Sequence, residues 1–128
     1  MKIIVLAAGQ GTRLRPLTDN IPKCMVPLKG KPLIDYQLEL FKSKSIKDIT
    51  IVGGYLIEKL KSKNINLITN KAYETTNMVH SLFCAEKELN DDVIISYGDI
   101  VYTDKVLQKL IDSNENISVV VDKNWKEY

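Results

Sequence analysis

A glycine-rich segment with several cations lies near the start of the chain. Gly9 and Gly11 are separated by one residue. Three cations follow them: Arg13, Arg15 and Lys23. Glycines allow a tight turn that brings bare amide groups close to a ligand, and guanidinium and ammonium groups neutralise phosphate charge. Because Asp19 is the only acid in residues 1–31, this segment predicts a binding site for a small polyanion.

Two familiar glycine loops do not fit this segment. A dinucleotide-binding loop needs a third small residue where this chain has Leu14, and a helix must follow at once. Pro16 disfavours helical geometry at Arg15. A Walker-type loop needs Gly-Lys-Ser/Thr, which does not occur after Gly11. The remaining interpretation is a glycine loop in which cations, and not a helix terminus, neutralise a triphosphate.

Two further segments carry polar groups that could face the same ligand. Gly98-Asp99 follows a predicted buried strand, so its carboxylate is expected in the crevice at the carboxyl ends of the strands, although Gly-Asp is also ordinary turn chemistry. Residues 70–82 form a loop that runs into a helix whose first turn could contact a base. Within it, Asn77 is either a base contact or only a helix N-cap. His80 is interpreted as a helix-surface or pocket-lining residue.

The elements that would position these residues alternate between strands and helices. Apolar runs predict strands at 3–7, 49–53, 93–97 and 117–121, with a weaker one at 66–69. Helical spacing begins at Pro32 and ends near Lys44, with Leu33, Tyr36, Leu40 and Phe41 on its apolar face. A second helix begins near Thr76 or Asn77 with the stripe Met78, Leu82, Ala85 and Leu89. A third follows Thr103 with the apolar face Val106, Leu107, Leu110 and Ile111, and a short one spans 56–61.

This order predicts an α/β fold: a Rossmann-like, open, mainly parallel sheet with helices on both faces. The net charge of +2 does not indicate nucleic acid as a partner, and no apolar run is long enough to span a membrane. Cys24 and Cys84 match no metal or redox spacing and have no adjacent base, which predicts reduced thiols, a cytoplasmic setting and no nucleophilic catalysis. The oligomeric state, including a homo-oligomer, stays open.

The string from Leu6 to Thr18, followed by Pro22-Lys23 and Gly30-Lys31-Pro32, closely resembles the nucleotidyltransferase superfamily that activates sugar phosphates and choline phosphate. The segment with Asn77 and Ser81 is similar to the choline-phosphate cytidylyltransferase branch. The resemblance implies an Mg²⁺ ion on Asp99 and three catalytic residues: Arg13, Lys23 and Asp99. Lys23 would lie near the α-phosphate. The implied nucleotide-binding residues are Leu6, Ala7, Ala8, Gly9, Gly11, Thr12, Arg13, Lys23, Asn77, Ser81 and Gly98.

The implied reaction is transfer of a nucleoside monophosphate, CMP from CTP, to a phosphorylated or phosphonate small molecule such as choline phosphate, with release of pyrophosphate. Two alternatives stay open: a sugar-1-phosphate nucleotidyltransferase using UTP, dTTP or GTP, and a non-catalytic nucleotide-binding module. Members of the superfamily are longer than 128 residues. We therefore expect residues 1–128 to be the nucleotide-binding part, in a truncated chain or one completed by another subunit, without the acceptor-binding part and the second metal-binding acid.

Overall fold

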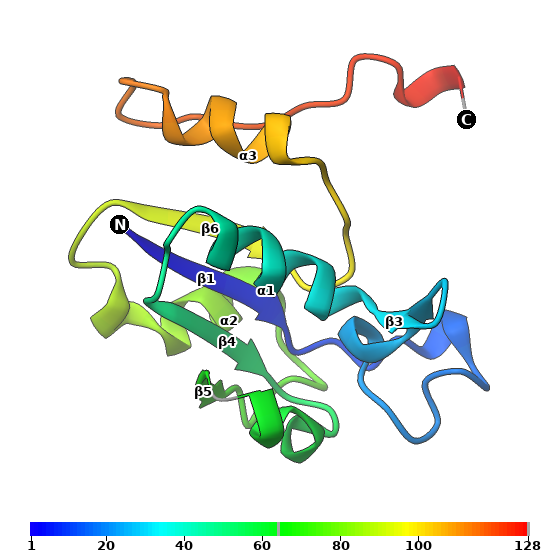
Figure 1. Ribbon diagram of the computed structural model, residues 1–128. Coiled ribbons are helices and arrows are strands. Elements are labelled where there is room, and N and C mark those ends of the chain that lie inside the picture. Colours follow the sequence, from blue (N-terminus) through cyan, green and yellow to red (C-terminus); the bar gives the residue numbers. More distant parts are fainter. Residues whose placement is uncertain (64, 128) are drawn as a thin grey trace.

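The chain forms a parallel sheet flanked by helices on both faces. A computed structural model describes residues 1–63 and 65–127. The main sheet has the strand order β5-β4-β1-β6, and each neighbouring pair is parallel. Its strands are Lys2–Ala7 (β1), Ile49–Gly53 (β4), Asn66–Thr69 (β5) and Val93–Tyr97 (β6) (Figure 1). The predicted open parallel α/β sheet and four of its five predicted strands are therefore confirmed.

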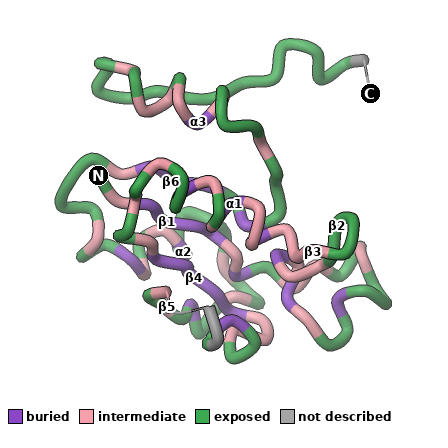
Figure 2. Tube along the Cα trace, viewed as in Figure 1, coloured by how far each residue is buried: buried purple, intermediate pink, exposed green. Residues whose placement is uncertain are grey.

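Strand β1 is the centre of the core because both of its faces are covered. Ile3 and Val5 belong to one apolar cluster with Ile34 and Phe41 of helix α1 (Leu33–Ser43). Ile4 belongs to a second cluster on the opposite face, beside helix α2 (Met78–Cys84). Figure 2 shows the buried positions running along β1 and β4 between these helices. Burial on both faces explains why the strand is a continuous apolar run in the sequence.

Helices α1 and α2 both differ in detail from the prediction. The buried positions of α1 are Ile34, Gln37 and Phe41, so of the predicted apolar face only Phe41 is fully buried. Helix α2 ends at Cys84, where Ala85 leaves helical geometry and a 3₁₀ turn follows. The predicted stripe is wrong at both ends, since Met78 is 53% and Leu89 is 38% exposed. The predicted bounds of α1 are confirmed, whereas its buried face and the length of α2 differ from the prediction.

Several short elements connect the sheet and the helices. The 3₁₀ turns are Thr12–Leu14 (η1), Lys23–Met25 (η2), Ile57–Lys63 (η3), Glu86–Glu88 (η4) and Trp125–Glu127 (η5). A small antiparallel hairpin joins Pro27–Leu28 (β2) to Lys31–Pro32 (β3). The predicted short helix at 56–61 corresponds to η3. None of the helices in the described ranges has the length and apolar character needed to cross a membrane.

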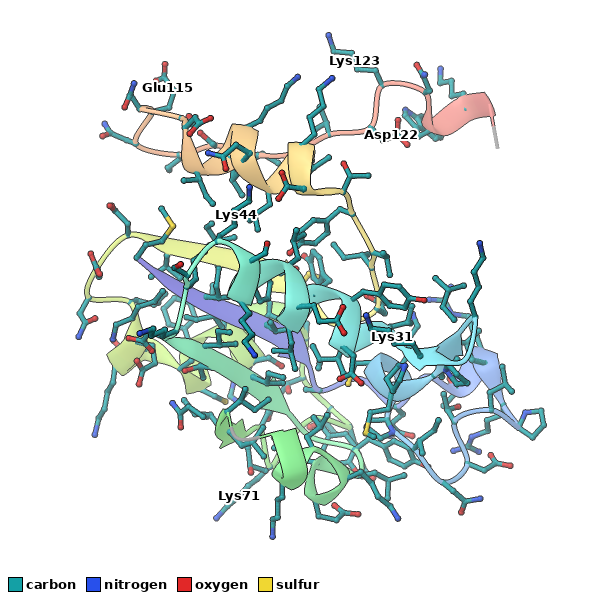
Figure 3. All side chains as sticks on the ribbon, viewed as in Figure 1. Lys31, Lys44, Lys71, Glu115, Asp122 and Lys123 are labelled. Carbon is teal, nitrogen blue, oxygen red and sulfur yellow. The ribbon has the colours of Figure 1, made fainter. Side chains whose placement is uncertain are left out.

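The predicted strand at 117–121 is wrong. Helix α3 (Asp104–Ile111) buries Leu107, and its Asp104 Oδ1 forms an ion pair of 2.6 Å with Nζ of Lys44, the residue that directly follows α1. Figure 3 shows Lys44 between α1 and α3. After α3 the chain turns back and runs beside it, with Ile117 84% and Val119 77% exposed. A strand is stable only with a pairing partner, and this segment lies away from the sheet (Figure 1).

Candidate functional site

Hydrogen bonds from neighbouring side chains hold the glycine loop in place. Gly11 has a φ of +65°, the left-handed region that favours glycine, and a Cβ there would lie 3.1 Å from Lys23 Cβ. The fully buried Thr18 donates its hydroxyl hydrogen to the Gly11 carbonyl at 2.8 Å. Tyr55 in turn donates to the Thr18 carbonyl at 3.0 Å. These contacts fix the loop at the carboxyl end of β1, close to Lys23.

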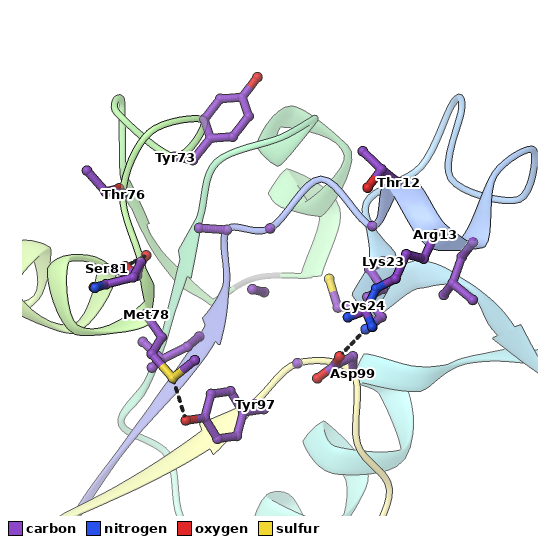
Figure 4. Close-up of a pocket in the computed structure, with 18 residues that line it drawn as sticks. Thr12, Arg13, Lys23, Cys24, Tyr73, Thr76, Met78, Ser81, Tyr97 and Asp99 are labelled. Atoms are coloured by element: carbon purple, nitrogen blue, oxygen red, sulfur yellow. Dashed lines mark hydrogen bonds and ion pairs between the residues drawn. The ribbon is translucent and has the colours of Figure 1, made fainter.

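A pocket of about 640 Å³ opens beside this loop (Figure 4). It is lined by the loop, by η2, by the end of β6 and by the segment that leads into α2. All the residues that the family resemblance implies for catalysis or nucleotide binding lie around this one pocket: Leu6, Ala7, Ala8, Gly9, Gly11, Thr12, Arg13, Lys23, Asn77, Ser81, Gly98 and Asp99. Its volume is in the range of small-molecule and cofactor sites. Four segments distant in sequence therefore meet at the carboxyl edge of the sheet.

Asp99 reaches the pocket because β6 ends in close contact with β1. The Gly98 amide donates to the Leu6 carbonyl at 2.9 Å. A Cβ on Gly98 would lie 2.8 Å from Ala7 Cβ, so only glycine allows this approach. On the other face, the buried Gln37 amide donates to the carbonyls of Tyr97 and Ile100, each at 2.7 Å. The segment that carries Asp99 is thus fixed on both sides.

Lys23 and Asp99 form an ion pair across the pocket (Figure 4). Each side chain is 33% exposed, so both can be reached by a ligand. Arg13 also lines the pocket, and among residues 1–63 and 65–127 it takes part in no ion pair. The pocket therefore contains one internally neutralised pair and one cation that can bind an anion.

The structure places Arg15 outside the pocket, against the prediction that it helps to neutralise a triphosphate. Its Nε lies 3.7 Å from Asp19 Oδ1, and both side chains are about half exposed. The geometry of η1 explains the difference, because this turn directs Arg13 toward Lys23 while Arg15 leaves the turn in extended geometry. Spacing alone could not assign the direction of either side chain.

Asn77 is a helix N-cap that also lines the pocket. Its Oδ1 accepts hydrogen bonds from the Val79 and His80 amides at 3.0 and 3.2 Å. Its amide nitrogen remains as a donor at the pocket wall. His80 itself is exposed and lies outside the pocket lining. Neither described cysteine forms a disulfide, and Cys24 lies buried in the pocket floor.

Sequence reasoning missed several lining residues: Leu14, Cys24, Tyr73, Thr76, Met78 and Tyr97. Tyr73 and Thr76 fall inside the 70–82 loop, but loop residues have no periodicity that would show which side chains face inward. Partial desolvation, with the neighbouring Glu74 carboxylate, raises the pKa of the Tyr73 hydroxyl, so it stays protonated at neutral pH. Tyr97 donates to the Met78 sulfur at 2.8 Å across the pocket floor.

Comparison with known proteins identifies the family of this fold. Residues 3–127 match the model of the MobA-like NTP transferase domain. The chain is 47% identical to the CTP:phosphoglutamine cytidylyltransferase of Campylobacter jejuni, over 98% of this chain and 54% of that protein. It is 44% identical to the choline-phosphate cytidylyltransferase of Streptococcus pneumoniae, over 80% of this chain and 46% of that protein.

A solved structure agrees with this assignment. The CTP:phosphocholine cytidylyltransferase of Streptococcus pneumoniae superposes with a TM-score of 0.70 and 45% identity, over 77% of this chain and 44% of that one. The similarity therefore includes both the fold and the sequence. The chain spans about half the length of the relatives it matches.

Proposed function

Since the chain belongs to the family of MobA-like NTP transferase domains, we propose that it is the nucleotide-binding part of a cytidylyltransferase. The complete enzyme would transfer CMP from CTP to a phosphorylated or phosphonate small molecule and release pyrophosphate. The observation that carries the proposal is the convergence of Arg13, Lys23 and Asp99 beside a glycine loop in one pocket. The cytidylyltransferases among its relatives support cytosine as the base.

The pocket supports a division of tasks between its two ends. Gly11, Thr12 and Arg13 would bind the β- and γ-phosphates, because a glycine turn presents amide groups and Arg13 is a cation with no partner in the described ion pairs. Lys23 would lie at the α-phosphate, where negative charge develops as the acceptor attacks. The base would occupy the other end, between Leu6 to Gly9 and the wall that contains Asn77 and Ser81.

Asp99 fits the requirements of a magnesium ligand. Mg²⁺ prefers one or two carboxylates, with phosphate oxygens and water completing its octahedral shell, so a single carboxylate beside a phosphate site is a sufficient donor set. The described residues contain no group of three acidic, histidine or cysteine side chains that would compete as a metal site. When bound, the ion would neutralise phosphate charge and fix the geometry of the triphosphate.

The proposed chemistry is direct in-line displacement at the α-phosphorus. An oxygen of the acceptor phosphate or phosphonate forms the new bond, and the bond to pyrophosphate breaks. Lys23 and Arg13 stabilise the charge on the transferred and departing groups, which is the role of preorganised cations in phosphoryl-type transfers. This route requires no enzyme nucleophile, which is consistent with a pocket lining that contains a cysteine but no histidine to activate it.

Binding and turnover would test this proposal separately. For the 128-residue chain, we expect calorimetric titration to detect Mg-CTP, and Lys23→Ala to weaken that binding by about tenfold, the loss of one charge-assisted contact. In a chain extended to the length of its relatives, the same variant should lower pyrophosphate release by at least about a hundredfold. An unchanged turnover in the Lys23→Ala variant would contradict the mechanism, and turnover with sugar 1-phosphates and UTP alone would reassign the substrate.

A further inference from the structure

Asn70 is a buried amide at the base of the loop that forms one pocket wall. It directly follows β5, is 1% exposed, and its backbone amide donates to the Gly53 carbonyl at 2.8 Å. Its side-chain Oδ1 accepts from the Ala72 amide at 2.9 Å. A backbone N–H can only donate, so this contact fixes which end of the side-chain amide is oxygen. The NH₂ end must therefore point the opposite way.

That NH₂ group donates to two hydroxyl oxygens on the pocket wall, Thr76 Oγ1 and Ser81 Oγ, each at 3.0 Å. Both hydroxyl hydrogens are already used, because Thr76 donates to the Ala72 carbonyl at 2.8 Å and Ser81 to the Asn77 carbonyl at 3.3 Å. A hydroxyl has one hydrogen and two lone pairs. After these contacts each hydroxyl keeps a single lone pair and no hydrogen for a ligand.

Asn70 and the two backbone carbonyls together determine the hydrogen-bonding character of this wall. Because an NH₂ group can only donate, neither hydroxyl can turn its hydrogen toward Asn70. With their hydrogens on the Ala72 and Asn77 carbonyls, the Thr76 and Ser81 hydroxyls are acceptors toward a ligand in the pocket. The adjacent Asn77 amide nitrogen is a donor, since its oxygen is occupied by the Val79 and His80 amides.

We propose that Asn70 is a positioning residue for base selection: its NH₂ group fixes the Thr76 and Ser81 oxygens, whose hydrogens backbone carbonyls hold, so that both act as acceptors that favour a base with an exocyclic amino group over its carbonyl analogue. This inference rests on the proposed function, which places the base against this wall. Cytosine presents an amino group next to a ring nitrogen acceptor, which matches an acceptor next to a donor. Uracil presents a carbonyl oxygen at the same position, so two acceptors would face each other.

The test compares CTP and UTP binding to the 128-residue chain by calorimetric titration with Mg²⁺. We expect the wild type to bind CTP about tenfold more tightly than UTP, the range for one mismatched hydrogen bond in a buried site. Ser81→Ala should weaken CTP by about fivefold and leave UTP nearly unchanged. Asn70→Ala leaves the hydroxyl hydrogens on the backbone carbonyls but no longer fixes the two oxygens, so the preference should fall to about twofold through weaker CTP binding. Thr75→Ala, a hydroxyl deletion outside the pocket lining, should keep the wild-type ratio.

The double variant Asn70→Ala/Ser81→Ala separates positioning from loss of structure. If Asn70 acts through Ser81, the double variant should lose little more of the preference for CTP over UTP than either single variant does. Independent effects would instead add. A wild type that binds CTP and UTP equally, or variants that weaken both nucleotides by the same factor, would overturn the inference and leave the proposed function intact. Failure to bind any NTP would overturn both. Should Asn70→Ala not fold, Ser81→Ala against Thr75→Ala decides the question.

Discussion

Replacing Asp99 with asparagine should strengthen binding of metal-free CTP. In the free protein Asp99 holds Lys23 in an ion pair, so a triphosphate must break this pair before Lys23 can reach a phosphate. The carboxylate also repels the phosphates directly. An asparagine side chain has nearly the same shape but no charge, which removes both penalties. The variant thus reverses the simple expectation that loss of an active-site residue weakens ligand binding.

The size of this effect follows from the exposure of the pair. Each side chain is 33% exposed, so the attraction is screened and worth about 0.5–1 kcal/mol. Repulsion between Asp99 and a phosphate a few ångströms away adds about 1 kcal/mol at an effective dielectric constant between those of the protein surface and water. Together they amount to about 1.5–2 kcal/mol, or roughly a 10- to 30-fold tighter Kd for CTP in EDTA.

Calorimetric titration with CTP in EDTA and in Mg²⁺ would measure both sides of the exchange. In Mg²⁺ the wild type should gain affinity, because the ion replaces Lys23 as the partner of Asp99, while the Asp99→Asn variant should gain much less. The matched control is Asp19→Asn, which removes the same charge from an exposed pair with Arg15 outside the pocket. If Asp99→Asn binds metal-free CTP no more tightly than Asp19→Asn does, then Asp99 does not compete with the triphosphate for Lys23.

Two further predictions concern stability. Gly98→Ala should lower the free energy of unfolding by about 1–3 kcal/mol, and the melting temperature by several degrees, because its Cβ would lie 2.8 Å from Ala7 Cβ. Gly9→Ala should lower neither quantity, because Gly9 has open space around it. Asp91→Asn should reduce stability near pH 7, since the Met1 ammonium lowers the pKa of Asp91 and Asp91 raises the pKa of that ammonium. The difference in stability between the wild type and Asp91→Asn should vanish when the pH falls through the lowered pKa of Asp91 or rises through the raised pKa of the ammonium group. Thermal melts across this pH range would measure it.

The chemistry-bearing loop could be predicted from sequence because each of its features is local. Gly11 adopts the positive φ that its residue type suggests, and Pro16 prevents the helix that a dinucleotide site requires. The parallel strand order then brings Asp99 to the same edge, since the carboxyl ends of parallel strands lie together. Local conformation and strand direction were therefore sufficient to bring the glycine loop and Asp99 to one pocket.

The parts that could not be predicted depend on contacts between distant segments. Residues 117–121 have the composition of a buried strand, but a strand must also pair with a neighbouring strand. In this chain the segment runs beside α3 instead. Arg15 is a second example, because its residue type suits a phosphate but its side chain pairs with Asp19 outside the pocket. Residue type predicts what a side chain can bind, whereas packing decides what it faces.

The pocket wall that is proposed to contact the base depends even more on such distant contacts. The sequence of the 70–82 loop presents amides and hydroxyls, which can each donate or accept, so it does not specify a base. The buried network removes this ambiguity, because Asn70 fixes the two hydroxyl oxygens and the Ala72 and Asn77 carbonyls take their hydrogens. Base preference is then a property of a buried network and not of the lining residues alone. A relative with the same lining residues but a different residue at position 70 should therefore have a different CTP-to-UTP ratio.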